Sequence, residues 1–218
     1  MIFGKIEYLN LLPFDIFMKR HTRSSQQLQS IHYKRGVPSS INKAFKTRRV
    51  NAAFISSIAS SRCHCLDLGI SAKKEVKSVL LIPGKNQIDN ESATSNVLAR
   101  VLGLEGEVII GDKALKYYLQ DNKNEAIDLS QRWFEKQKLP FVFARLCYHG
   151  KSTKYKKMSQ KFLHTPKKIP QYILNISSRK TGISNKEILK YLQLIEYKLD
   201  PHAILSLKRF LRLAKKLK

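Results

Sequence analysis

Six stretches of the chain have the apolar, β-branched or aromatic composition that is typical of β-strands. In the first, Ile6 and Tyr8 alternate with polar residues, and this pattern breaks at Asn10, three residues before Pro13. The six predicted strands are Ile2–Tyr8, Ser30–Tyr33, Ala52–Ile55, Val76–Ile82, Val108–Ile110 and Phe141–Cys147.

Helical patterns separate these strands along the chain. Pro38 suits the first turn of a helix that continues through Phe45, because proline has no N–H to lose there. Further helices are predicted over Ser95–Val101, Lys113–Leu119 and Leu129–Gln137. Alternating strands and helices predict an α/β fold with a largely parallel sheet.

The last third of the chain is predicted to be helical. Ser184 and Glu187 have the spacing of a capping box, and Asp200 followed by Pro201 marks the start of another helix. This last helix is amphipathic and basic, so it could lie on a membrane or pack on the sheet. We favour packing on the sheet.

Two apolar runs, Val79–Pro83 and Phe141–Cys147, could form a hinge that joins two lobes. We therefore expect a first lobe of residues 1–82 and 146–218 and a smaller second lobe of residues 83–145.

The charge balance indicates anionic partners. The 218 residues include 41 Lys and Arg against 16 Asp and Glu, a formal net charge of +25. A nucleic-acid partner rests on charge alone, because neither an RNA-binding signature nor zinc-finger spacing is present. The densest basic run, Lys151–Lys161, is predicted to be a solvated helix face.

The three cysteines, Cys63, Cys65 and Cys147, form no even-numbered framework, which indicates reduced thiols and a cytosolic protein. Cys63-His64-Cys65 lacks a second half at zinc-like spacing, so no metal is expected. Strand-like sequence begins at Ile2, and no apolar stretch approaches the length of a membrane span. We expect a soluble, cytoplasmic protein.

Small polar residues follow strands or precede helices in four places. Helix N-termini present unpaired N–H groups, so four such places around one cleft could hold carboxylates or phosphates. N-capping is the alternative for each, and for Asp112 it is favoured because a carboxylate would repel an anion. The candidate residues are Asn10, Ser56, Ser57, Ser92, Thr94, Ser95, Gly111 and Asp112.

Motifs in this order make the chain resemble the chorismate dehydratases of the futalosine route to menaquinone. The opening Gly4–Pro13 is similar to the start of that family. The later matching segments are Ile55–Ser57, Val76–Val79, Ser92–Ser95, Ile110–Leu115, Asp128–Leu129 with Trp133, Leu139–Ala144, Tyr191–Leu192 and Tyr197–Leu199.

The resemblance implies a two-lobed fold like that of type II periplasmic binding proteins, with a hinge and a ligand cleft. It also implies a hydro-lyase that converts chorismate to 3-[(1-carboxyvinyl)oxy]benzoate without a cofactor. Chorismate carries two carboxylates, which helix N-termini and hydroxyls could bind. The six serine, threonine and glycine candidates and Asp112 are therefore expected to bind substrate.

None of the four stretches contains a histidine that could remove the ring proton. We expect a substrate carboxylate to act as the base, with the Asn10 amide aligning the leaving hydroxyl or the carboxylate, because an amide both donates and accepts hydrogen bonds. An asparagine that only closes a turn is the alternative.

Three other functions were weighed. The 1,4-dihydroxy-6-naphthoate synthases of the same pathway share the fold but resemble an opening with Ser-Pro-Cys-Pro-Asn-Asp, which is missing here. A non-catalytic protein that binds small anions would share the cleft but would need export or a lipid anchor. A nucleic-acid-binding protein is supported only by charge, and the oligomeric state stays open.

Overall fold

The computed structural model describes residues 1–23, 31–84, 87–88, 90–120 and 126–217. Its strands form two sheets, one of six strands in the order β2-β1-β3-β8-β4-β9 and one of three in the order β6-β5-β7. The strands are β1 (Ile2–Lys5), β2 (His32–Arg35), β3 (Ala52–Ser56), β4 (Cys65–Ala72), β5 (Val79–Ile82), β6 (Glu107–Ile110), β7 (Ile127–Asp128), β8 (Phe141–Tyr148) and β9 (Glu196–Lys198). The expected strand at Ser30–Tyr33 starts outside the described residues.

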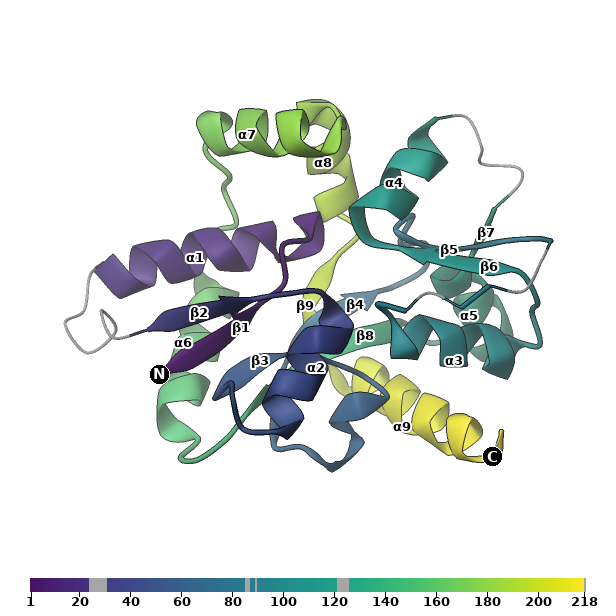
Figure 1. The fold of residues 1–218 in the computed structure, drawn as a ribbon, viewed down its shortest axis with the longest axis horizontal. Helices are drawn as coiled ribbons and strands as arrows, with labels where there is room; N and C mark the ends of the chain where they lie inside the picture. The colour runs from purple at the N-terminus through teal and green to yellow at the C-terminus, as the bar shows by residue number, and fades with distance from the viewer. Residues whose placement is uncertain (24–30, 85–86, 89, 121–125, 218) are drawn as a thin grey trace.

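Helices surround both sheets, so the expected α/β class is confirmed. In Figure 1 the second sheet lies to the right of the first, with α4 above it and α3 and α9 below it. The helices are α1 (Leu12–Arg23), α2 (Pro38–Lys46), α3 (Ala93–Leu102), α4 (Gly111–Leu119), α5 (Leu129–Gln137), α6 (Thr153–His164), α7 (Gln171–Thr181), α8 (Asn185–Leu192) and α9 (Pro201–Lys215), with 3₁₀ turns η1 (Leu9–Leu11) and η3 (Ala59–Arg62).

Local sequence signals placed several helix starts correctly. Pro38 is the first residue of α2. The Ser184 side chain accepts a hydrogen bond from the Glu187 N–H, and Asp200 accepts one from the Ala203 N–H. These caps confirm the predicted starts of α8 and α9 because each satisfies an N–H group that the helix itself leaves unpaired.

The prediction of a largely parallel sheet is wrong. Only β1 pairs in parallel, with β2 and β3, whereas β8 runs antiparallel between β3 and β4. Strand β9 adds to β4 antiparallel, and both pairs of the second sheet are antiparallel. The direction of β8 follows from topology, since the chain returns to the first sheet from the second, and sequence patterning carries no such information.

The chain crosses between the sheets twice, at residues 73–78 between β4 and β5 and at residues 138–140 between α5 and β8. The Asp128 carboxylate holds the first crossing, because it accepts the N–H groups of Val76 and Lys77 as well as capping α5. The chain thus passes from one sheet to the other at these two crossings. The lobe boundaries expected from the sequence lie a few residues later, after residues 82 and 145.

Strand β1 ends at Lys5, three residues before the predicted end at Tyr8. The last contact with the neighbouring strand is the hydrogen bond from the Gly36 N–H to the Lys5 carbonyl. The chain then leaves the sheet and forms the turn η1 directly before α1. Asn10 is therefore held in a 3₁₀ turn and does not terminate a strand.

Helix α9 packs on the body of the molecule, as predicted. Its residues Ala203, Leu207 and Phe210 are buried, and Phe210 packs at 5.1 Å against Phe141 of β8. The buried Trp133 indole donates a 2.9 Å hydrogen bond to the Ser206 hydroxyl. Among the described helices, we find none with the length and apolar character that crossing a membrane requires.

The expectation of reduced cysteines is wrong for two of the three. Cys65 of β4 lies opposite Cys147 of β8, and the two form a disulfide. They are 82 positions apart, so only the strand register could reveal this pairing. Cys63 is a free thiol. Because Cys65 is bonded, Cys63-His64-Cys65 is not available as a metal-binding unit.

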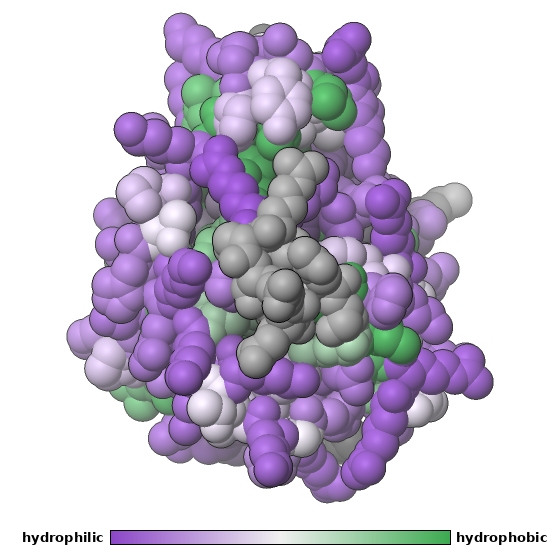
Figure 2. Space-filling model, turned by 90° about the vertical axis from the view of Figure 1, so that its left-hand side faces the viewer, coloured by the Kyte–Doolittle hydropathy of each residue, from purple (hydrophilic) through white to green (hydrophobic). Residues whose placement is uncertain are grey.

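Much of the surface is hydrophilic. Figure 2 shows one face covered mostly by hydrophilic residues, with separate hydrophobic patches among them. On α7, the side chains of Tyr172 and Ile176 are exposed. The basic run Lys151–Lys161 lies largely on α6, where Tyr155 and Met158 are buried while the lysines are exposed. That run is thus a solvated helix face, as predicted.

Candidate active site

A cavity of about 640 Å³, including space open to solvent, is lined by residues of both sheets and their adjoining turns. Six of the eight candidate residues line it: Asn10, Ser56, Ser92, Thr94, Ser95 and Gly111. The remaining described lining residues are mostly apolar, and none of the lining side chains is an acid, a lysine, an arginine or a histidine.

Asn10 is held at the cavity by two tyrosines from the C-terminal part of the chain. The Tyr197 hydroxyl, from β9, donates a 2.7 Å hydrogen bond to the Asn10 main-chain carbonyl. The Tyr191 hydroxyl, from α8, lies close enough to the Asn10 side chain for Asn10 to lower the pKa of Tyr191 in part. The turn η1 is thus fixed from outside, and the amide keeps donor and acceptor capacity towards the cavity.

Tyr191 extends this arrangement to a further lining residue, Ser78. The two hydroxyl oxygens lie 2.9 Å apart, and Tyr191 is buried. Burial raises the pKa of Tyr191, although the hydrogen bonds with Ser78 and Asn10 lower it in part. Tyr191 therefore stays protonated and can act as a hydrogen-bond donor. The sequence did not identify Ser78 as a lining residue or Tyr191 as its partner. The only signal was that both lie in segments that resemble the family, Val76–Val79 and Tyr191–Leu192.

The N-terminus of α3 brings three of the predicted hydroxyl residues together. Ser92 is the N-cap, since its oxygen accepts the Ser95 N–H, and its hydroxyl also donates to the Ser95 hydroxyl at 2.8 Å. The Thr94 hydroxyl accepts the Ile58 N–H at 3.2 Å. Ser92 thus both caps α3 and lines the cavity. From the sequence, these two roles had been treated as alternatives.

The N-terminus of α4 reaches the same cavity through Gly111. Its φ of +70° suits glycine, and a Cβ there would come within 2.9 Å of the Tyr8 ring. The N-cap, Ile110, provides no side-chain hydrogen bond. The N-terminus of α4 therefore lies at the cavity, and the acidic side chain of its first turn, Asp112, is outside the cavity lining.

Two of the predicted site residues do not line the cavity. Ser57 is buried in the protein, where its hydroxyl donates to the Val142 carbonyl at 2.6 Å. Ser56, its neighbour, does line the cavity and accepts a 2.8 Å hydrogen bond from the Asn42 amide. Of the pair, only Ser56, the last residue of β3, therefore lines the cavity.

Asp112 differs from both predictions made for it. It does not line the cavity and does not cap its own helix; instead, its carboxylate accepts the Leu9 N–H at 3.0 Å. Burial raises the pKa of this carboxyl to about 6, although the Leu9 hydrogen bond and the charge of Lys180 lower it in part. Asp112 thus anchors the turn that carries Asn10.

Three hydrogen bonds join the two sides of the cavity. They run from the Leu9 N–H to Asp112, from the Ile58 N–H to Thr94, and from the Tyr8 hydroxyl to the Glu91 carboxylate. Each donor belongs to the first-sheet part of the chain and each acceptor to the second-sheet part. These hydrogen bonds thus link the two parts of the chain around the cavity.

Known proteins with related sequences were compared with the chain. A family described as "menaquinone biosynthesis" matches residues 1–107 and 103–216. A protein of Campylobacter jejuni subsp. jejuni serotype O:23/36 (strain 81-176), named "chorismate dehydratase", is 46% identical over 221 residues, which cover 100% of this chain and 99% of that protein. The match thus extends over the whole chain.

Solved structures agree on the fold. Protein AF1704 of Archaeoglobus fulgidus superposes with a TM-score of 0.68 at 13% identity, covering 99% of this chain and 97% of that one. The periplasmic aliphatic sulphonate binding protein SsuA of Escherichia coli gives a TM-score of 0.56 at 11% identity, covering 100% and 92%. These similarities confirm the expected periplasmic-binding-protein-like fold.

Proposed function

The chain belongs to the chorismate dehydratase family of menaquinone biosynthesis, and we propose that it removes water from chorismate in the cavity around Asn10. The product is 3-[(1-carboxyvinyl)oxy]benzoate, and the enzyme is a hydro-lyase. One observation carries the proposal for this site: two helix N-termini and a cluster of hydroxyls surround Asn10 in a cavity whose described lining has no charged side chain.

The lining suits a substrate with two carboxylates, one of which must remove a proton from the substrate's own ring. The N-termini of α3 and α4 direct the positive ends of their dipoles towards a carboxylate in the cavity without adding a fixed cation. A lysine or arginine in contact with a carboxylate would lower its basicity. Because helix N-termini also lower the basicity of a carboxylate, the substrate carboxylate that acts as the base is the one that faces the apolar part of the lining.

The reaction is an elimination across two neighbouring ring carbons. A substrate carboxylate takes the proton from the carbon that bears the enolpyruvyl ether and passes it to the hydroxyl on the next carbon, which leaves as water, so the carboxylate is regenerated. The C–H electron pair becomes the new ring double bond, which completes the aromatic ring. No electrons are gained or lost overall, so the step needs no oxidant or reductant.

Asn10 is proposed to orient this step. Its amide can donate to the leaving hydroxyl and accept from, or donate to, the substrate, while Tyr191 and Tyr197 keep it in place. The apolar walls formed by Ile6, Phe54 and Phe143 exclude water from the reacting carbons.

Mass spectrometry of the purified protein incubated with chorismate tests the function. We expect chorismate to disappear and a product lighter by one water to accumulate, with an aromatic ultraviolet spectrum. Binding of chorismate without any turnover would favour the small-anion-binding alternative, and neither binding nor turnover would contradict the proposal.

A further inference from the structure

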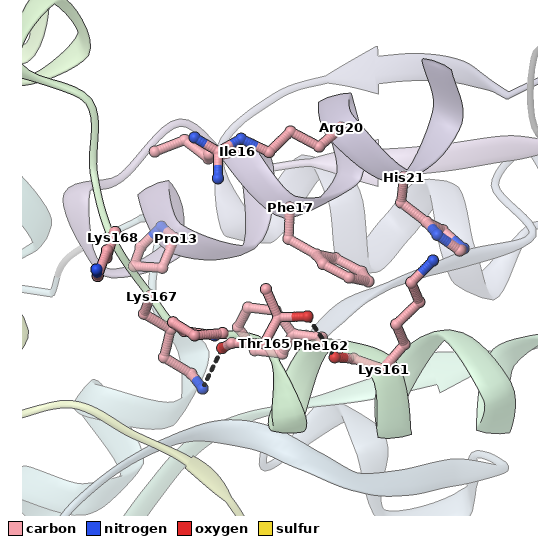
Figure 3. A pocket seen from close by; sticks show the side chains of 11 residues that line it. Pro13, Ile16, Phe17, Arg20, His21, Lys161, Phe162, Thr165, Lys167 and Lys168 are labelled. Carbon is pink, nitrogen blue, oxygen red and sulfur yellow. Dashed lines mark hydrogen bonds between the residues drawn. The ribbon is translucent and has the colours of Figure 1, made fainter. Parts of the chain in front are cut away.

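A second cavity lies between α1 and α6 and shares no lining residue with the candidate active site (Figure 3). It has a volume of about 580 Å³, including space open to solvent. Its walls come from α1, from the end of α6 and from the segment that follows α6. Nothing in the proposed reaction uses these residues.

The floor of this second cavity is aromatic. The rings of Phe17 and Phe162 are 5.3 Å apart in an edge-to-face arrangement, and both side chains are buried. The His21 imidazole stacks on Phe17 at 5.2 Å. Figure 3 shows Phe17 pointing from α1 into the space above α6. A flat apolar ring would find suitable edge-to-face partners here.

The rim is cationic, and Glu196, outside the lining, raises the pKa of Lys167 in part. Four lining residues carry a positive charge, and no acidic residue lines the cavity. Lys180 and Lys73, elsewhere on the surface, pair with Glu7 and Glu196. By contrast, the four rim cations have no carboxylate ion pair within the described parts of the chain. They are Arg20, Lys161, Lys167 and Lys168.

Positive charge is disfavoured inside this cavity. Lys161 extends towards the His21 ring in Figure 3, and burial together with the Lys161 charge lowers the pKa of His21. The Lys167 ammonium lies 5.0 Å from the centre of the Phe162 ring, and burial lowers the pKa of Lys167. An anion in the cavity would relieve both effects, because it stabilises the charged forms of its neighbours.

We propose that this cavity is a second binding site, for a small dianion that carries an apolar ring. The ring would pack on Phe17 and Phe162, and the anionic group would meet the lysines of the rim. Neither half alone would fill the site: an inorganic anion leaves the aromatic floor bare, and a neutral ring leaves the cations uncompensated. The combination distinguishes this site from the general basic surface.

The floor of the second cavity also reaches the candidate active site through one side chain. The Phe162 ring packs edge-to-face on Tyr197 at 5.3 Å, and Tyr197 donates the hydrogen bond to the Asn10 carbonyl. A ligand that displaces Phe162 would weaken this contact and slow turnover. This effect on turnover rests on the proposed function. Binding of a ligand to the second cavity does not depend on that function.

Isothermal titration with phenyl phosphate, inorganic phosphate and phenol tests the binding. We expect wild-type protein to bind phenyl phosphate at least about tenfold more tightly than either control compound. The double variant Lys161→Gln/Lys168→Gln should lose this preference. The matched control Lys156→Gln/Lys157→Gln, with two exposed lysines of the same helix outside the cavity, should keep it.

Equal binding of phosphate and phenyl phosphate, or unchanged binding by Lys161→Gln/Lys168→Gln, would overturn the proposal. In kinetic assays we expect saturating phenyl phosphate to lower kcat about threefold in wild type, with little change in KM, and to leave Lys161→Gln/Lys168→Gln unaffected. An increase in KM alone would indicate competition at the active site and would overturn the regulatory role. If wild type does not turn over chorismate, the titration still decides the binding.

Discussion

The Tyr197 hydroxyl donates a 2.7 Å hydrogen bond to the main-chain carbonyl of Asn10, a residue 187 positions earlier in the chain. This bond connects β9, at the edge of the first sheet, to the turn that directs the Asn10 amide into the cavity. The C-terminal part of the chain therefore completes a site whose lining residues lie between Ile6 and Ala144.

Removing this hydroxyl should impair catalysis more than folding. In Tyr197→Phe we expect kcat for chorismate to fall about tenfold, because the turn η1 loses a restraint worth about 1 kcal/mol. Steady-state kinetics and urea unfolding provide the two measurements. Tyr155→Phe is the matched control, since the buried Tyr155 hydroxyl has no hydrogen-bond partner in the described parts of the chain. Equal kcat in both variants would contradict the role given to Tyr197.

Gly111 should tolerate no side chain. In Gly111→Ala the Cβ would meet the Tyr8 ring at 2.9 Å, and φ is +70°. Gly103→Ala is a matched control, because Gly103 has φ of +71° and open space around its Cβ position. We expect both variants to lose about 1 kcal/mol of stability through backbone strain. Only Gly111→Ala should also lose substrate affinity, as measured by equilibrium binding of chorismate.

Asp112 should act through its acceptor oxygen. Asp112→Ala leaves the Leu9 N–H without its acceptor, which should cost about 1–3 kcal/mol of stability and lower kcat, since Asn10 follows Leu9 directly. Asp112→Asn keeps an acceptor oxygen and should retain most of the activity. Thermal unfolding and initial rates compare the two variants, and equal loss in both would show that the charge matters more than the hydrogen bond.

Asp15 should make stability depend on pH. Burial raises its pKa to about 6, from an ordinary value of 3.8, despite the ion pair with Lys5 at 3.3 Å. The folded state therefore holds a proton that the unfolded state releases, so the contribution of Asp15 to stability increases as the pH falls from 7 to 4.

In Asp15→Asn, urea unfolding should show a flatter dependence of stability on pH, with a difference from wild type that changes by about 1 kcal/mol or more between pH 7 and pH 4.5. Asp67→Asn, which changes an exposed carboxylate, is the control. A wild-type slope in Asp15→Asn would show that this carboxyl is ionised normally.

The sequence predicted local features well because they depend on near neighbours. The caps at Ser184 and Asp200 and the start of α2 at Pro38 follow from residues within one turn of the helix. Strand β4 was not predicted: its sequence, Cys65–Ala72, contains Asp67 and Gly69, which interrupt any apolar run, and pairing on both sides supplies the missing stability.

The sequence predicted which types of residue would gather at the site, but it did not predict how they are arranged or held there. Ser92, Thr94 and Asn10 face one cavity, as predicted from strand ends and helix starts. Ser57, one residue after the end of β3, is outside the cavity lining, because its hydroxyl is bonded to the Val142 carbonyl, a contact that no local pattern contains. The contributions of Tyr191 and Tyr197 arise from contacts over more than 100 positions, which no local pattern contains.

The central claim is that the Asn10 amide orients chorismate for loss of water, and separate measurements of binding and turnover in Asn10→Ala and Asn10→Asp test it most directly. Ultraviolet absorbance should show kcat reduced at least about 100-fold in both variants, while equilibrium binding to Asn10→Ala stays within about threefold of wild type. Wild-type turnover in both variants would contradict the claim.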